Sequence, residues 1–219
     1  MSQGKIKALI HRELLIKFND DVYRALVKHE AMIAGGAITS LVTGQKVNDI
    51  DIYFHNQLGF DEVNDAFKAD KDYIEVCNTN NAITYRDVPL DQDIQLIKIN
   101  MAEDAYNLIS TFDMFHNAIA FTCGLNTLVA HPNFEECIVQ RKLMYNPKAK
   151  YPISSLQRIF KYLQRGYTIS NFDLAMVALK IASLNIKNRE DLERELRGID
   201  TDAFNDFMST LSNIYIGSW

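Results

Sequence analysis

The segment that most constrains this chain runs from residue 32 to 54 and reads MIAGGAITSLVTGQKVNDIDIYF. It opens with a short apolar run that ends in Gly35 and Gly36. An apolar run followed by paired glycines predicts a strand and a tight turn, and the residues after them predict a short helix. The segment therefore predicts a strand, turn and helix that bring the backbone of two glycines to the end of a strand.

The alternating end of the same segment predicts a second strand. Asp49 and Asp51 lie two residues apart, and side chains at this separation share one face of a strand. Ile50, Ile52 and Phe54 then point to the opposite, apolar side. The pattern predicts two carboxylates aimed the same way from a strand whose other face is buried.

These parts together suit one kind of ligand. Two adjacent carboxylates repel each other, and a divalent cation that binds both removes the conflict. Gly35 and Gly36 let a phosphate approach backbone N–H groups, and the following helix directs its positive end at that anion. Ser40 adds a hydroxyl on the same helix. The combination indicates a site for a metal–nucleoside-triphosphate complex, in which two metal ions would suit in-line nucleotidyl transfer.

The same segment resembles the signature of the polymerase-beta-type nucleotidyltransferase superfamily, in which an apolar run and paired glycines precede a D-x-D strand. It is most similar to the branch of bacterial poly(A) polymerases and CCA-adding tRNA nucleotidyltransferases, although GGAITS stands where that branch has a GGxxRD-like turn. The resemblance implies an α+β fold with a mixed, palm-like sheet. It also implies catalysis with Mg²⁺ or Mn²⁺ held by Asp49 and Asp51, an NTP substrate, and a tRNA-like RNA 3′ end as acceptor.

Two later segments extend the resemblance. TFDMFHNAIAF matches the branch's RRDFTINAMAY, which places Asp113 and Asn117 at its Asp and Asn, with Thr111 and Phe112 replacing the arginine pair. SSLQRIFKYLQRGYTI resembles the helix that follows the catalytic domain. The resemblance implies nucleotide-binding roles for Asp113, Asn117, Arg158 and Lys161. The basic residues of that helix equally fit a solvated stripe over an apolar face.

A third acid completes the metal site in the superfamily. The strand LDQDIQLIKI offers Asp93, and by the period of two Gln95 shares its face. Asp93 is the acid best placed in sequence, so we assign it as catalytic. If Gln95 instead holds the metal-facing position, the activating metal loses a ligand charge.

The remaining patterns divide the chain into two parts. Residues 1–145 predict a nucleotidyltransferase domain with helices at its N-terminus, and residues 146–219 predict a small helical domain. NPKAKYP, from residue 146 to 152, is the expected linker. The strongest helical patterns beyond it cover residues 154–167, 173–184, 189–197 and 202–211.

Composition excludes several other classes. Cys77, Cys123 and Cys137 are scattered, which argues against a disulfide framework or a cysteine zinc site and indicates a reducing cytoplasm. No apolar run reaches the roughly 18 residues of a membrane span, so we expect no membrane partner. The net charge of −5 disfavours binding nucleic acid over the whole surface.

The sequence thus predicts a compact, metal-dependent nucleotidyltransferase. Two rival hypotheses stay open. One is a nucleotide-binding or interaction protein that keeps the fold without catalysis, and the other is a toxin-type transferase that modifies a cellular RNA or protein.

Overall fold

The computed structural model describes residues 1–196, which form parts of two compact units. The first unit comprises residues 1–112 and 116–138. The second comprises residues 113–115 and the chain from Val139 onward. No helix within residues 1–196 has both the length and the apolar character that crossing a bilayer requires.

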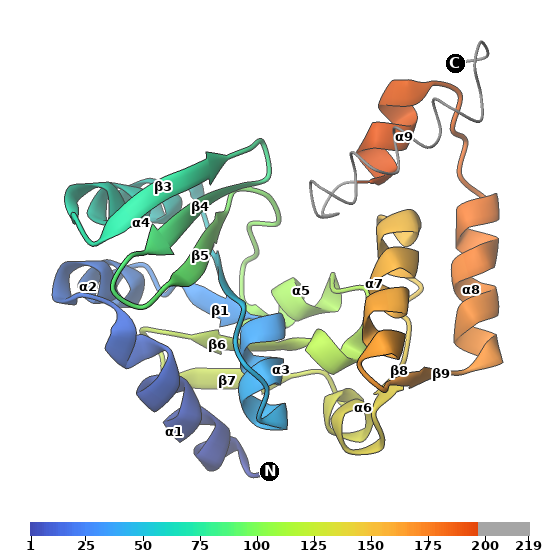
Figure 1. Ribbon diagram of the computed structural model, residues 1–219, viewed down its shortest axis with the longest axis horizontal. Coiled ribbons are helices and arrows are strands. Elements are labelled where there is room, and N and C mark those ends of the chain that lie inside the picture. Colours follow the sequence, from blue (N-terminus) through green and yellow to red (C-terminus); the bar gives the residue numbers. More distant parts are fainter. Residues whose placement is uncertain (197–219) are drawn as a thin grey trace. The chain divides into compact units, whose positions relative to one another are not determined.

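A seven-stranded mixed sheet organises the first unit (Figure 1). Its order is β3-β4-β5-β2-β1-β6-β7, and β2 and β5 run parallel whereas all other neighbours are antiparallel. The strands are β1 (Met32–Ala34), β2 (Asp49–Tyr53), β3 (Tyr73–Asn78), β4 (Ala82–Asp87), β5 (Gln92–Ile97), β6 (Ile119–Thr122) and β7 (Thr127–Ala130). This architecture confirms the expected α+β class with a mixed sheet.

Helices connect and cover these strands. Two of them begin at residues whose side chains accept a hydrogen bond from the first turn: Asn56 from the Gly59 N–H and Asp104 from the Asn107 N–H. The helices are α1 (Gln3–Glu13), α2 (Asp20–Lys28), α3 (Gly36–Thr43), α4 (Gln57–Ala69), α5 (Ala105–Ser110) and α6 (Phe134–Gln140), with 3₁₀ turns η1 (Leu15–Lys17) and η2 (Phe115–Asn117).

The core of the first unit forms on one face of the sheet. Ile50, Ile52 and Phe54 are almost fully buried, as the alternation of β2 predicted. They belong to one apolar cluster with residues of α1, α2 and α4. On the outer face, the side chains of β2 and β5 that alternate with the buried ones are half-buried, whereas β1 and β6 are buried on both faces.

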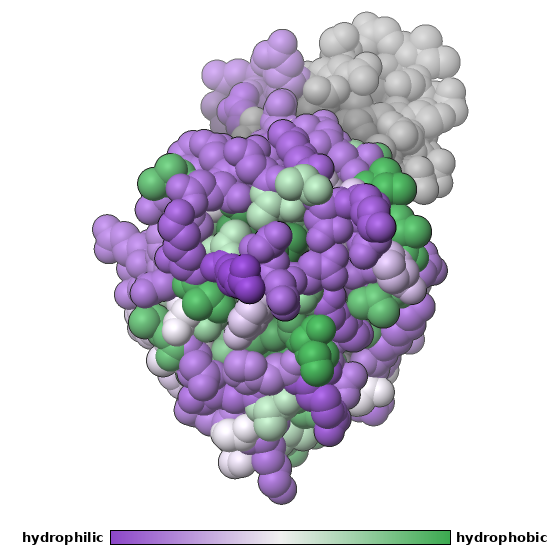
Figure 2. All heavy atoms as spheres, turned by 90° about the vertical axis from the view of Figure 1, so that its left-hand side faces the viewer, coloured by the Kyte–Doolittle hydropathy of each residue, from purple (hydrophilic) through white to green (hydrophobic). Residues whose placement is uncertain are grey.

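The surface seen from the left of Figure 1 is mostly hydrophilic (Figure 2). Hydrophobic side chains on this side gather only in small areas between polar ones. Scattered exposed apolar residues are normal for globular proteins. This face therefore gives no sign of a large apolar docking surface.

A buried acid at the end of β4 makes stability depend on pH. Asp87 is 5% exposed and accepts a hydrogen bond from the Leu90 N–H at 3.1 Å. Burial raises the pKa of this carboxyl above its ordinary value of 3.8, an effect that the Leu90 N–H and Lys17 oppose. Since the folded state binds the proton more tightly than the unfolded chain, ionising Asp87 costs stability as the pH rises through these pKa values.

We therefore expect Asp87→Asn, which keeps the acceptor oxygen and removes the charge, to unfold at a higher temperature than wild type at neutral pH. The gain should shrink as the pH falls and disappear below the carboxyl's ordinary pKa, where both folded and unfolded wild type are protonated. Thermal unfolding followed by circular dichroism over this pH range measures it. A variant that is less stable at neutral pH would show that the charge is favourable where it lies.

The second unit packs three helices with a short strand pair. These are α7 (Pro152–Gln164), α8 (Asn171–Ala182), α9 (Arg189–Glu195), β8 (Lys142–Leu143) and β9 (Thr168–Ile169). Met114, Tyr145 and Ile159 are among its buried core residues. The two-residue strands and α6 were missing from the sequence analysis, and the helix expected over 202–211 lies outside the described residues.

The expected linker begins as a packed part of the second unit. Asn146 is buried and donates its N–H to the Asp113 carbonyl at 2.8 Å. Its own carbonyl accepts the N–H of the buried Ala149 at 2.9 Å. These hydrogen bonds hold residues 146–149 as an ordered turn.

Candidate active site

Strand β2 carries the acidic pair on the face away from the core. Asp49 and Asp51 are both half-buried, while the residues that alternate with them are buried. Tyr53 is the next residue on the acidic face, because it follows Asp51 by two. The local pattern of β2 thus produces two carboxylates and an aromatic ring in one row.

The parallel neighbour β5 adds two polar side chains beside this row. In the strand register Asp93 lies opposite Asp49, and Gln95 lies opposite Asp51. Ile94 and Leu96, which alternate with them, are buried in the core. Both candidates for the third position therefore share the face of the acidic pair, one beside each aspartate.

Asp93 is held by an arginine of the next strand. Arg86 of β4 donates from Nε to Asp93 Oδ1 and from Nη2 to Asp93 Oδ2, the latter at 3.0 Å. Its Nη1 donates to Asp91 Oδ1 at 2.7 Å. These hydrogen bonds with Asp93 and Asp91 raise the pKa of the Arg86 guanidinium, so the arginine is charged throughout the physiological range.

The glycine turn follows directly after β1. Ile33 pairs with Ile52, and one further step in this antiparallel register brings Ala34 opposite Asp51. Gly35 comes next, with φ 78° and ψ −131°, and α3 starts at Gly36. A Cβ built on Gly36 would meet no atom within 4 Å. The first N–H groups of α3 therefore begin two residues beyond the strand position beside Asp51, with open space at Gly36.

Residues further along α3 fix the turn. The Thr39 N–H donates to the Gly35 carbonyl at 3.1 Å, and the Thr39 hydroxyl lies 3.1 Å from the carbonyls of both Gly35 and His116. Ser40 is half-buried in the next position. Thr39, which lies in the GGAITS stretch that departs from the family pattern, thus ties the glycine turn to η2.

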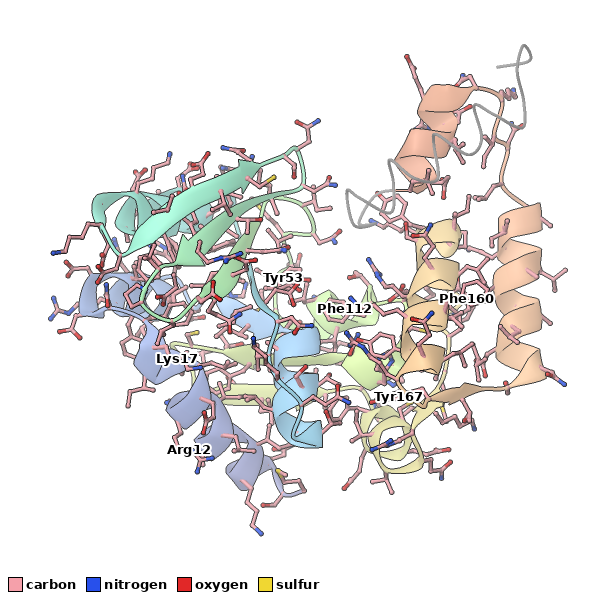
Figure 3. All side chains as sticks on the ribbon, in the orientation of Figure 1. Arg12, Lys17, Tyr53, Phe112, Phe160 and Tyr167 are labelled. Carbon is pink, nitrogen blue, oxygen red and sulfur yellow. The ribbon has the colours of Figure 1, made fainter. Side chains whose placement is uncertain are left out.

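Two aromatic rings stand beside the turn. Phe112 Cε2 would lie 3.4 Å from a Cβ on Gly35, and its ring centroid lies 5.9 Å from that of Tyr53 (Figure 3). Both side chains are half-buried. Neither residue was among the site residues predicted from the sequence. The available signal was the position of Tyr53, two residues after Asp51.

The backbone at Gly35 requires glycine. Its positive φ falls where a side chain is strained, at a cost of roughly 1–3 kcal/mol, whereas a Cβ there would make ordinary van der Waals contact with Phe112. We expect Gly35→Ala to lower the free energy of unfolding by that amount and to weaken NTP binding. Gly36→Ala, whose Cβ meets nothing within 4 Å, is the matched control for stability. Denaturant unfolding measures the loss of stability and calorimetric NTP titration the loss of binding, and an equal loss of stability in the two variants would contradict the strain at Gly35.

The acidic pair suits one type of metal ion. Residues 1–196 contain no group of three or more His, Cys, Asp or Glu side chains arranged to hold a metal. Mg²⁺ commonly binds through one or two carboxylates and takes its other ligands from water and substrate phosphates. Asp49 and Asp51 fit that donor set, whereas a closed structural metal site is absent from this part of the chain.

The other predicted residues divide between the units. Asn117 lies in η2, in the first unit. Asp113, Arg158 and Lys161 belong to the second unit, where Arg158 Nη1 donates to Asp113 Oδ2 at 2.7 Å. Lys161 is exposed on α7. The structure thus brings Gly35, Asp51 and their neighbours together, and it pairs Asp113 with Arg158 in the other unit.

Solved structures with this fold include CCA-adding enzymes. The Thermotoga maritima CCA-adding enzyme complexed with tRNA matches with a TM-score of 0.55 and 13% identity, over 92% of this chain and 53% of that enzyme. A CCA-adding enzyme in complex with CTP matches with a TM-score of 0.57 and 17% identity, over 84% of this chain and 49% of that enzyme. At these identities the likeness shows the fold alone, which this chain shares with the CCA-adding enzymes.

One sequence relative and one family model give the chain's affiliation. The Gabija anti-defense 2 protein of Bacillus phage SPbetaL7 is 30% identical over 194 residues, which is 85% of this chain and 46% of that protein. The chain therefore spans less than half the length of this relative. Residues 5–141, which include the acidic pair and the glycine turn, match the model of the Gabija anti-defense 2 family. The chain belongs to the Gabija anti-defense 2 family.

Proposed function

We propose that this protein is a metal-dependent nucleotidyltransferase that transfers NMP from an NTP to a hydroxyl acceptor and releases pyrophosphate. One observation carries the proposal: Asp49 and Asp51 share the outer face of β2, next to the strand that ends in the Gly35–Gly36 turn and the start of α3. This arrangement puts a cation-binding pair beside a polyphosphate-binding helix start.

Each residue contributes a distinct interaction. The N–H groups at the start of α3, with Gly36 leaving room for close approach, would bind the triphosphate. Asp49 and Asp51 would hold Mg²⁺ or Mn²⁺, which when bound supplies electrostatic stabilisation of the charge that develops on the reacting phosphate. Tyr53 and Phe112 offer aromatic surface to the nucleoside. In the second unit Arg158 and Lys161 keep the phosphate-binding role that the family resemblance implies.

Two observations favour different acceptors for the transferred NMP. The fold shared with CCA-adding enzymes, one of them complexed with tRNA, favours a tRNA-like RNA 3′ end and a place near the poly(A) polymerase and CCA-adding branch. Membership of a family named for Gabija anti-defense favours instead an RNA or protein component of that defence or of the host, modified to block it. The second acceptor class corresponds to the toxin-type alternative.

Label transfer tests the function and separates the acceptors. The purified protein is incubated with Mg²⁺ and each of the four α-³²P-labelled NTPs, together with total RNA or with extract from cells that carry the Gabija defence. We expect one labelled RNA or protein band that depends on Mg²⁺ and accompanies release of pyrophosphate. NTP binding by calorimetry without label transfer to any acceptor would reject the transferase and support the non-catalytic rival.

A further inference from the structure

A row of charged side chains crosses three neighbouring strands of the outer sheet face. Arg86 of β4 lies opposite Asp93 of β5, and Asp93 lies opposite Asp49 of β2. Neighbouring strands are about 4.8 Å apart, so Asp93 stands between a guanidinium and a carboxylate. In the next row Gln95, which is neutral, lies opposite Asp51.

Arg86 occupies both oxygens of Asp93. It donates one hydrogen bond to each oxygen, and its third nitrogen donates to Asp91 at 2.7 Å. A two-point contact between guanidinium and carboxylate is stronger and more directional than a single ion pair. Each Asp93 oxygen keeps a second lone pair, but a cation bound there would share the carboxylate's charge with these hydrogen bonds and would lie close to the positive charge of Arg86.

We propose that Arg86 is a positioning residue that keeps Asp93 out of the cation site, so that Asp49 and Asp51 bind a single divalent ion. This inference rests on the proposed function, because it concerns the same acidic pair. The two negative charges of Asp49 and Asp51 balance one divalent cation, and the third carboxylate is already balanced by Arg86. The site thus differs from the arrangement of two metal ions and three acids that the family resemblance implies.

The number of bound ions tests the proposal without an activity assay. Mn²⁺ alone is titrated into the protein, and electron paramagnetic resonance of the free ion reports how many ions bind. An Asp49→Asn/Asp51→Asn variant supplies the background from other surface acids. Wild type should bind one ion above this background. Arg86→Gln, which frees Asp93, should bind a second, and Arg86→Gln/Asp93→Asn should return to one with the wild-type affinity.

Each outcome has a distinct meaning. Two ions above background in wild type, or one ion in Arg86→Gln, would overturn the role of Arg86 and leave the transferase intact. A loss of about 10–100-fold in Mn²⁺ affinity in Arg86→Gln/Asp93→Asn would identify Asp93 as part of the metal site and overturn the inference as well. No ion above background in wild type would remove the metal site itself, and the proposed function with it. The Arg86→Gln/Asp93→Asn variant removes the positive and the negative charge of this ion pair together. Its Mn²⁺ affinity therefore tests the role of Asp93 even where Arg86→Gln alone proves unstable.

Discussion

Replacing Asp49 and Asp51 together by asparagine should reduce NMP transfer by about a thousandfold or more. The estimate follows because a bound cation contributes several kcal/mol to stabilising the reacting phosphate, and about 1.4 kcal/mol corresponds to a tenfold change in rate. Asparagine keeps the shape of the side chain, and it removes two neighbouring like charges from β2. We therefore expect the variant to unfold at the same temperature as wild type or slightly higher. Initial rates of ³²P label transfer at saturating Mg²⁺ measure the loss.

The control for this experiment lies on the other side of the same sheet. Asp65 is exposed on α4, the helix whose apolar residues pack in the core behind β2. Asp65→Asn makes the same chemical change and should leave the rate unaltered. If Asp49→Asn/Asp51→Asn lowers the rate of NMP transfer no more than Asp65→Asn does, the cation site lies elsewhere and the transferase proposal fails.

The positions of Asp49, Asp51 and Gly35 could be predicted because each depends on a pattern of neighbouring residues in the sequence. The alternation of β2 fixes which side Asp49 and Asp51 take, and the apolar run before Gly35 fixes where β1 ends. Both depend on the period of a strand and on the conformational freedom of glycine, which a sequence displays directly. The buried Ile50 and Ile52 confirm that this reasoning was correct for the core face.

The other parts of the candidate site, Asp93 and the Arg158–Asp113 pair, depend on contacts between residues that are distant in the sequence. Asp93 reaches Asp49 only through a parallel register over 44 positions of chain, and Arg158 meets Asp113 across 45. The sequence offers no period that links such residues. Arg86 is the instructive exception: it lies seven residues before Asp93, across a hairpin whose register pairs the two. Counting outward from the turn would have found this ion pair from sequence.

The outer face of the sheet depends on the core behind it, which makes Phe67 the second position with a large expected effect. This residue of α4 is fully buried, and its ring lies 5.0 Å from that of Tyr85, stacked, and 4.7 Å from that of Tyr73. Tyr85 precedes Arg86 on β4, so the same packing supports the strand that holds Asp93.

Phe67→Ala should therefore lower the free energy of unfolding by about 3–5 kcal/mol, the usual cost of removing a buried aromatic ring and leaving a cavity. Leu58→Ala is the matched control, because Leu58 lies on the same helix with 62% of its surface exposed and should change stability by less than about 0.5 kcal/mol. Urea unfolding of both variants, followed by circular dichroism, gives the two values. Similar values for the two would mean that α4 does not pack its Phe67 face against β3 and β4, and the support for Arg86 would then have to come from the β4–β5 hairpin alone.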